Sequence, residues 1–87
     1  MSLRIYADFN SVSGDGWCWC LRYGGRVLDD VAKDLKLIEG QQVILFYEDE
    51  QEEFEFDAVL SHRNGLWQAR YNESTFRRLR DDSSKSM

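Results

Sequence analysis

The dipeptide Asn64-Gly65, set between two segments of alternating hydrophobicity, most constrains how this chain can fold. Asparagine followed by glycine is typical of the two-residue type I′ turn that joins antiparallel strands, because both turn positions need a positive φ. That turn pairs Arg63 with Leu66, and the following pairs on one face are then apolar or aromatic: His62–Trp67, Leu60–Ala69 and Ala58–Tyr71. The register is therefore self-consistent, with one buried face.

The segment before this hairpin extends the same sheet. Residues 43–47 are almost all apolar, which is typical of a strand buried on both faces. A charged bend over residues 49–52 places Tyr47 opposite Phe54 and Leu45 opposite Phe56. In the strand that follows, Phe54, Phe56, Ala58 and Leu60 alternate with the acidic residues Glu53, Glu55 and Asp57. One face of this strand is thus predicted to be apolar and the other acidic.

Residues 3–10 and 17–23 also alternate in hydrophobicity and predict two further strands. Leu28, Val31, Ala32 and Leu35 form a single apolar stripe at helical spacing, which predicts one short helix over residues 28–37. The predicted fold class is α+β and mostly β: a five-stranded, bent antiparallel sheet or small SH3-like barrel with one short helix. Residues 1–80 are predicted to form a single domain, and the polar residues 81–87 a disordered tail.

Three segments resemble known proteins. Residues 40–47, the charged bend and the Asn64-Gly65 hairpin resemble small SH3-like barrels, which implies a fold and no function. Residues 35–43 are similar to the helix–turn–strand of bacterial swapped-hairpin transition-state regulators, which are dimeric DNA-binding proteins. This chain lacks the basic, proline-started helix of that family and carries Asp29, Asp30 and Asp34 instead. Residues 4–11 are similar to the start of short bacterial single-domain proteins, and this similarity implies no activity.

The charge balance argues against non-specific binding to nucleic acid. Eleven Lys and Arg residues against sixteen Asp and Glu residues give a net charge of −5, whereas such binding depends on neutralising phosphates. Arg77, Arg78 and Arg80 nevertheless form a basic cluster, so a regulatory nucleic-acid binder remains an alternative. No apolar segment is long enough to span a membrane and no signal peptide opens the chain, so a cytoplasmic protein is expected.

The residues that carry chemistry are few. Cys18 and Cys20 share one face of a predicted strand and offer a soft metal two ligands, whereas zinc sites in proteins use three or four. A metal or small-ligand site at these cysteines is therefore the weaker alternative to two packed thiols. His62 is the only histidine, and it is predicted to pair with Trp67 rather than to act as an acid or base. We expect no enzyme activity and no cofactor.

One face of the predicted sheet changes from acidic to basic, because Arg63 and Arg70 share it with Glu53, Glu55 and Asp57. This pattern serves either internal charge balance or a self-complementary surface that favours a homodimer. We therefore expect a non-enzymatic protein-interaction module that binds another protein or a second copy of itself. The predicted contact residues are Tyr6, Trp19, Glu55 and Arg70.

Overall fold

The computed structural model describes residues 3–10, 12–19 and 21–81. Within them, short strands predominate and there is one α-helix. The elements are β1 (Arg4–Ala7), β2 (Trp17–Cys18), β3 (Leu21–Tyr23), β4 (Arg26–Val27), α1 (Leu28–Leu35), β5 (Gln42–Glu48), β6 (Glu52–Arg63), β7 (Leu66–Tyr71), the 3₁₀ turn η1 (Glu73–Thr75) and β8 (Arg77–Asp81). No helix among these residues is long and apolar enough to cross a bilayer.

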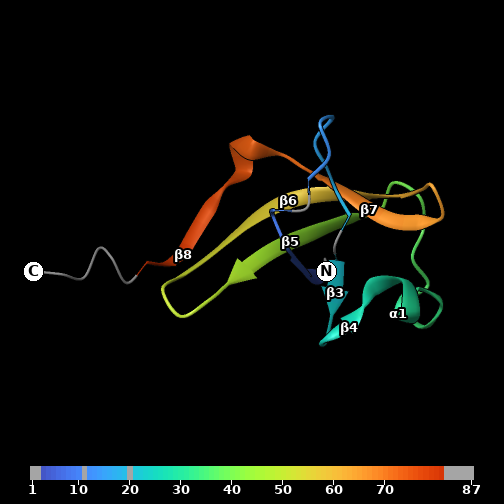
Figure 1. The fold of residues 1–87 in the computed structure, drawn as a ribbon, viewed down its shortest axis with the longest axis horizontal. Coiled ribbons are helices and arrows are strands. Elements are labelled where there is room, and N and C mark those ends of the chain that lie inside the picture. The colour runs from blue at the N-terminus through green and yellow to red at the C-terminus, as the bar shows by residue number, and fades with distance from the viewer. Residues whose placement is uncertain (1–2, 11, 20, 82–87) are drawn as a thin grey trace, which may run out of the picture.

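The strands form one curled, mixed sheet with the shape of a half-barrel. Seven of them follow the order β2-β7-β6-β5-β1-β3-β4, and β8 pairs with β6 outside this path. The long β5–β6 hairpin runs along the molecule. Helix α1 lies at one end of the molecule, whereas β8 and the tip of the hairpin lie at the other (Figure 1).

The predicted pairings of the β5–β6–β7 meander are confirmed. In β6 and β7, Arg63 lies opposite Leu66, and the apolar pairs from His62–Trp67 to Ala58–Tyr71 follow as expected. In β5 and β6, Leu45 lies opposite Phe56. Asn64 and Gly65 have φ values of 53° and 78°, as a type I′ turn requires. The residues around the turn were sufficient to predict these pairings, because a tight turn fixes the register of both its strands.

The mostly β class and the single short helix are confirmed, but the expectation of five antiparallel strands is wrong. Strand β1 pairs parallel to β5, with Ile5 opposite Leu45. The strand predicted over residues 17–23 is divided in two, and β2 pairs with β7 whereas β3 pairs with β1. Strands β4 and β8 were not predicted. Alternation reveals which face of a strand is buried, but it carries no information about the neighbouring strand.

Strands β7 and β8 pair with the same edge of β6, one after the other. The twelve-residue β6 is opposite β7 over residues 58–63 and opposite β8 over residues 52–55. Between them the chain turns outward, and the Asp57 N–H donates to Thr75 Oγ1 (2.8 Å) while the Asp57 C=O accepts from the Asn72 N–H (2.9 Å). Asp81, which was predicted to open the tail, belongs to β8. Residues 82–87 of the predicted tail lie outside the described residues.

Helix α1 covers one end of the sheet. It ends at Leu35, two residues earlier than predicted, because Lys36 adopts the left-handed conformation with φ 55°. Its buried residues are Leu28 and Val31. Asp29 accepts a hydrogen bond from the Trp67 N–H (2.8 Å), and this bond links the first turn of the helix to β7. The helix therefore stabilises the end of the sheet that lies near the Asn64-Gly65 turn.

The buried core lies on the face of the sheet that α1 covers, called the inner face below. Its members are apolar side chains from β1, β2, β3, α1, β5, β6 and β7, namely Ile5, Ala7, Cys18, Leu21, Leu28, Val31, Val43, Leu45, Ala58, Leu60 and Ala69. The opposite face is called the outer face. The inner face continues beyond this core towards the tip of the β5–β6 hairpin, which α1 does not reach (Figure 1).

Candidate functional site

Six aromatic side chains occupy the inner face beyond the core, and they form what we call the aromatic cluster. Their ring centroids lie between 4.7 and 5.9 Å from those of neighbours in the cluster, which consists of Phe9, Tyr47, Phe54, Phe56, Tyr71 and Phe76. None of the six is buried, and Phe76 is 43% exposed. The single helix lies at the other end of the sheet, so no helix of the described residues covers this end of the apolar face.

The cluster contains a small pocket next to the acidic hairpin tip. The pocket has a volume of about 220 Å³ and is lined by Phe9, Asn10, Tyr47, Glu52 and Phe54. The Tyr47 hydroxyl donates a hydrogen bond to Asp49 Oδ2 (3.2 Å). This bond and the charge of Asp49, together with burial and the charges of Tyr6 and Glu52, raise the pKa of Tyr47 above its usual value. The pocket therefore has an aromatic wall, with the carboxylate of Glu52 in its lining and that of Asp49 at the Tyr47 hydroxyl.

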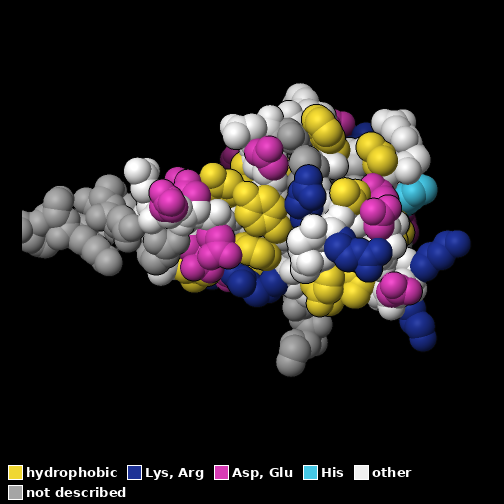
Figure 2. Space-filling view, turned by 60° about the horizontal axis from the view of Figure 1, so that its bottom comes forward, with side chains coloured by type: hydrophobic (Ala, Val, Ile, Leu, Met, Phe, Trp, Pro, Cys, Tyr) yellow, Lys and Arg dark blue, Asp and Glu magenta, His cyan; other side chains and the backbone are white. Residues whose placement is uncertain are grey.

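Figure 2 shows the surface character of this end of the molecule. Towards the narrow end, hydrophobic side chains reach the surface and acidic side chains lie on either side of them. An exposed group of aromatic rings with a charged rim is typical of a binding surface, since isolated soluble domains usually cover such patches.

The outer face carries a network of ion pairs centred on Glu55. Arg77 Nε lies 2.8 Å from Glu55 Oε2, and Arg4 Nη2 lies 3.0 Å from Glu55 Oε1. Arg77 also contacts Asp57 (2.8 Å), and Arg4 contacts Glu53 (3.6 Å). The side chain of Glu55 is only 13% exposed. The acidic strand is therefore partly neutralised within the chain by Arg77, which was predicted to join a basic cluster, and by Arg4, which was not predicted to have a role.

The pKa of Glu55 is lowered, because the hydrogen bonds and charges of Arg77 and Arg4 outweigh burial, which acts to raise it. A carboxylate with a lowered pKa in the folded state contributes stability above its unfolded pKa and loses it as the pH falls. We expect Glu55→Gln to lower the free energy of unfolding by about 1 to 2 kcal/mol at neutral pH. We also expect the variant to lose less stability than wild type between about pH 5 and pH 3.

Urea denaturation over this pH range measures both effects. Glu73→Gln is the matched control, because Glu73 is exposed and makes no ion pair among those found in the described residues. This control is expected to follow wild type closely. Equal pH dependence in wild type and Glu55→Gln would show that the network contributes nothing to acid stability.

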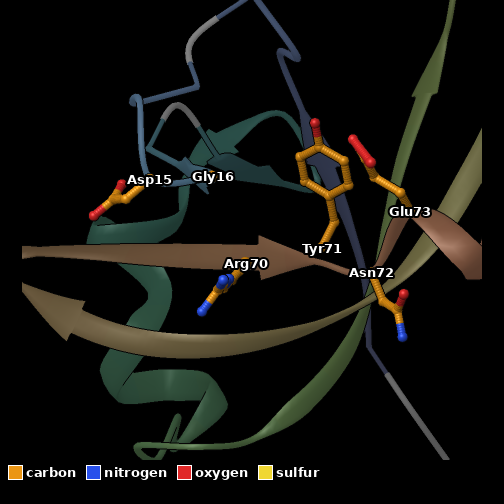
Figure 3. A pocket seen from close by; sticks show the side chains of 6 residues that line it. All are labelled: Asp15, Gly16, Arg70, Tyr71, Asn72 and Glu73. Carbon is orange, nitrogen blue, oxygen red and sulfur yellow. The ribbon is translucent and has the colours of Figure 1, made fainter.

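Arg70 borders a second, polar depression. This depression has a volume of about 500 Å³ and is lined by Asp15, Gly16, Arg70, Tyr71, Asn72 and Glu73 (Figure 3). Arg70 and Tyr71 point to opposite sides of β7, and the Glu73 carboxylate lies beside the Tyr71 ring (Figure 3). Burial and the charge of Glu73 raise the pKa of Tyr71.

Three of the four predicted contact residues, Tyr6, Glu55 and Arg70, lie on the outer face. Tyr6 packs against Phe46 with ring centroids 5.6 Å apart, and Phe46 lies opposite Glu55, so Tyr6 and Glu55 share the outer face. Arg70 lies opposite Val59, which is four residues further along β6 and therefore about 13 Å away. Trp19 is 49% exposed and lies outside the strands.

The sequence interpretation missed the aromatic cluster as a site because it assigned Phe54, Phe56 and Tyr71 to the apolar face of a strand. That face is observed. The lengths of the predicted helix and strand could have revealed the uncovered face. A helix of ten residues rises about 15 Å, whereas a strand from residue 53 to residue 63 extends over about 35 Å. One helix was too short to cover such a strand.

The sequence offered three other candidate sites, namely the two cysteines, His62 and the arginine cluster, and the structure describes most of their residues. Cys18 is buried, with its thiol 3.6 Å from the Asp8 carbonyl oxygen, and Cys20 lies outside the described residues. Among the residues described, no group of three or more His, Cys, Asp or Glu side chains is placed to hold a metal ion. His62 pairs with Trp67 at 5.2 Å, as predicted, although its side chain is exposed. Arg77 is engaged by Glu55 and Asp57.

Comparison with protein-family models, curated proteins and solved structures finds no match to this chain. Its function is therefore inferred from the fold and the side-chain geometry.

Proposed function

We propose that this protein is a non-enzymatic interaction module that binds a protein partner at the aromatic cluster. The observation that carries the proposal is a group of six contacting aromatic rings, five half-buried and one exposed, at the end of the sheet that α1 does not cover. Aromatic side chains are enriched in protein interfaces, and burying them supplies much of the binding free energy. Phe76 is the most prominent of them, since it packs on Phe54 and Phe56 while 43% of its surface stays exposed.

The likeness to small SH3-like barrels belongs to this proposal. It rests on the β5–β6–β7 meander, which gives a small domain a long, curved and rigid sheet on which to present side chains. The parallel pairing of β1 departs from an all-antiparallel barrel. The proposal therefore treats the meander as a scaffold, and it infers no ligand from the resemblance to SH3-like barrels.

The experiment compares proteins retained by immobilised wild type, Phe76→Ser and Leu66→Ser. Leu66 is the matched control, because it is 41% exposed and belongs to β7, outside the aromatic cluster. We expect a partner that binds wild type and Leu66→Ser but is lost with Phe76→Ser, while circular dichroism shows that all three are folded. A set of retained proteins that is identical for all three variants would overturn the proposal.

A second copy of the chain is the other partner that fits this surface. Light scattering over a concentration series tests it, and the expected result for a homodimer is a mass that doubles in wild type and not in Phe76→Ser. A dimer that persists in Phe76→Ser would place the self-contact elsewhere and contradict the role of the cluster.

A further inference from the structure

We infer that the partner inserts a lysine or arginine side chain into the pocket lined by Phe9, Asn10, Tyr47, Glu52 and Phe54. This inference rests on the proposed function and specifies the chemistry of what the aromatic cluster binds. It follows from three properties of the pocket: its size, its lining and the charges around it.

The size and lining suit a long cationic side chain. A volume of about 220 Å³ accommodates one large side chain but not a folded element. Three of the five lining residues are aromatic, and they offer ring surface to the alkyl stem of a lysine or arginine. The carboxylate of Glu52 and the amide oxygen of Asn10 are acceptors for the charged head group, and aromatic rings add cation–π attraction.

The surrounding charges complement a cation. The hairpin tip carries Asp49, Glu50 and Glu52, and no Lys or Arg occurs between residues 37 and 62. Glu48 and Glu53 lie on the outer face, where Arg4 contacts Glu53. Arg4 and Arg77, which lie on the other face, are engaged by Glu55. The pKa of Tyr47 is raised, first by its hydrogen bond to Asp49 and then by the charges of Asp49 and Glu52.

The cluster already contacts one guanidinium within the chain. Arg78 Cζ lies 5.6 Å from the centroid of the Phe76 ring, on the edge of the cluster formed by β8. Arg78 is not among the residues that line the pocket. These rings are therefore accessible to an arginine, and the ion pairs found among the described residues do not include Glu52.

The test is an NMR titration of the full chain with two capped pentapeptides, Gly-Gly-Arg-Gly-Gly and the same peptide with citrulline in place of arginine. Citrulline has nearly the same shape and no charge. We expect the arginine peptide to shift the amide signals of the five lining residues and to bind at least about threefold more tightly than the citrulline peptide. A lysine peptide and its norleucine counterpart are expected to behave in the same way.

Variants separate the pocket from general attraction to an acidic protein. Glu52→Gln is expected to reduce the affinity for the arginine peptide about threefold, whereas Glu73→Gln, which removes the same charge elsewhere, is expected to leave it unchanged. Equal binding of the arginine and citrulline peptides, or equal effects of the two variants, would overturn the inference.

The two proposals fail in different ways. A partner that is lost with Phe76→Ser but binds Glu52→Gln normally would support the proposed function and overturn the inference. An arginine peptide that binds in the pocket, with no protein retained through Phe76, would support the chemistry of the pocket and overturn its use in binding a protein.

Discussion

Replacing Leu45 with alanine is expected to lower the free energy of unfolding by about 3 kcal/mol. Leu45 is completely buried, and it lies in the middle of the sheet with Ile5 beside it on β1 and Phe56 beside it on β6. Truncation leaves a cavity that rigid strands on both sides cannot close. Because a chain of this size has a total stability of about 5 to 10 kcal/mol, the loss is a third of it or more.

Urea denaturation followed by circular dichroism measures this loss, with Leu66→Ala as the control. Leu66 is 41% exposed at the end of β7, so its truncation is expected to cost under about 1 kcal/mol. A similar loss in both variants would contradict the assignment of Leu45 to the core and would place the parallel β1–β5 pairing in doubt.

Replacing Phe56 with alanine is expected to lower the free energy of unfolding by about 2 to 3 kcal/mol, and replacing Phe76 with serine by under about 1 kcal/mol. Both belong to the aromatic cluster. Phe56 contacts four rings, those of Phe9, Phe54, Tyr71 and Phe76, with the shortest centroid distance 4.7 Å. Phe76 contacts two rings of the cluster, and 43% of its surface is exposed.

Thermal and urea denaturation of the two variants measure this difference, and the partner-retention experiment gives the complementary result. Phe76→Ser is expected to lose the partner although its fold is nearly as stable as that of wild type. If Phe76→Ser were as destabilised as Phe56→Ala, Phe76 would belong to the core, and the cluster would not be a docking surface.

The predicted hairpin succeeded in detail because its information is local. A two-residue turn at Asn64-Gly65 fixes the register of β6 and β7, and the alternation around it selects the inner face. The same reasoning placed Leu45 opposite Phe56. It failed for the N-terminal half, where β2 and β3 are adjacent in sequence but pair with strands on different sides of the sheet.

The candidate site was predicted only in part. Phe54 and Phe56 were correctly assigned to the apolar face, yet the lengths of the predicted helix and strand were not used to infer that part of this face would stay uncovered. Glu55 was selected as an exposed contact residue, whereas the structure places it between Arg4 and Arg77 with only 13% of its side chain exposed. Arg4 is 51 residues away from Glu55 in the chain, so this pairing has no local signal.

The sequence by itself determined the mostly β class, the single helix, the register of the β5–β6–β7 meander and the acidic and apolar faces of β6. These properties depend on periodicity and turn chemistry over a few neighbouring residues. The tertiary structure alone decided the parallel β1–β5 pairing, the addition of β8 to the edge of β6, the ion pairs of Glu55 and the exposure of the aromatic cluster. Each of these depends on which distant segments meet, and side-chain patterns within one segment do not specify its partner.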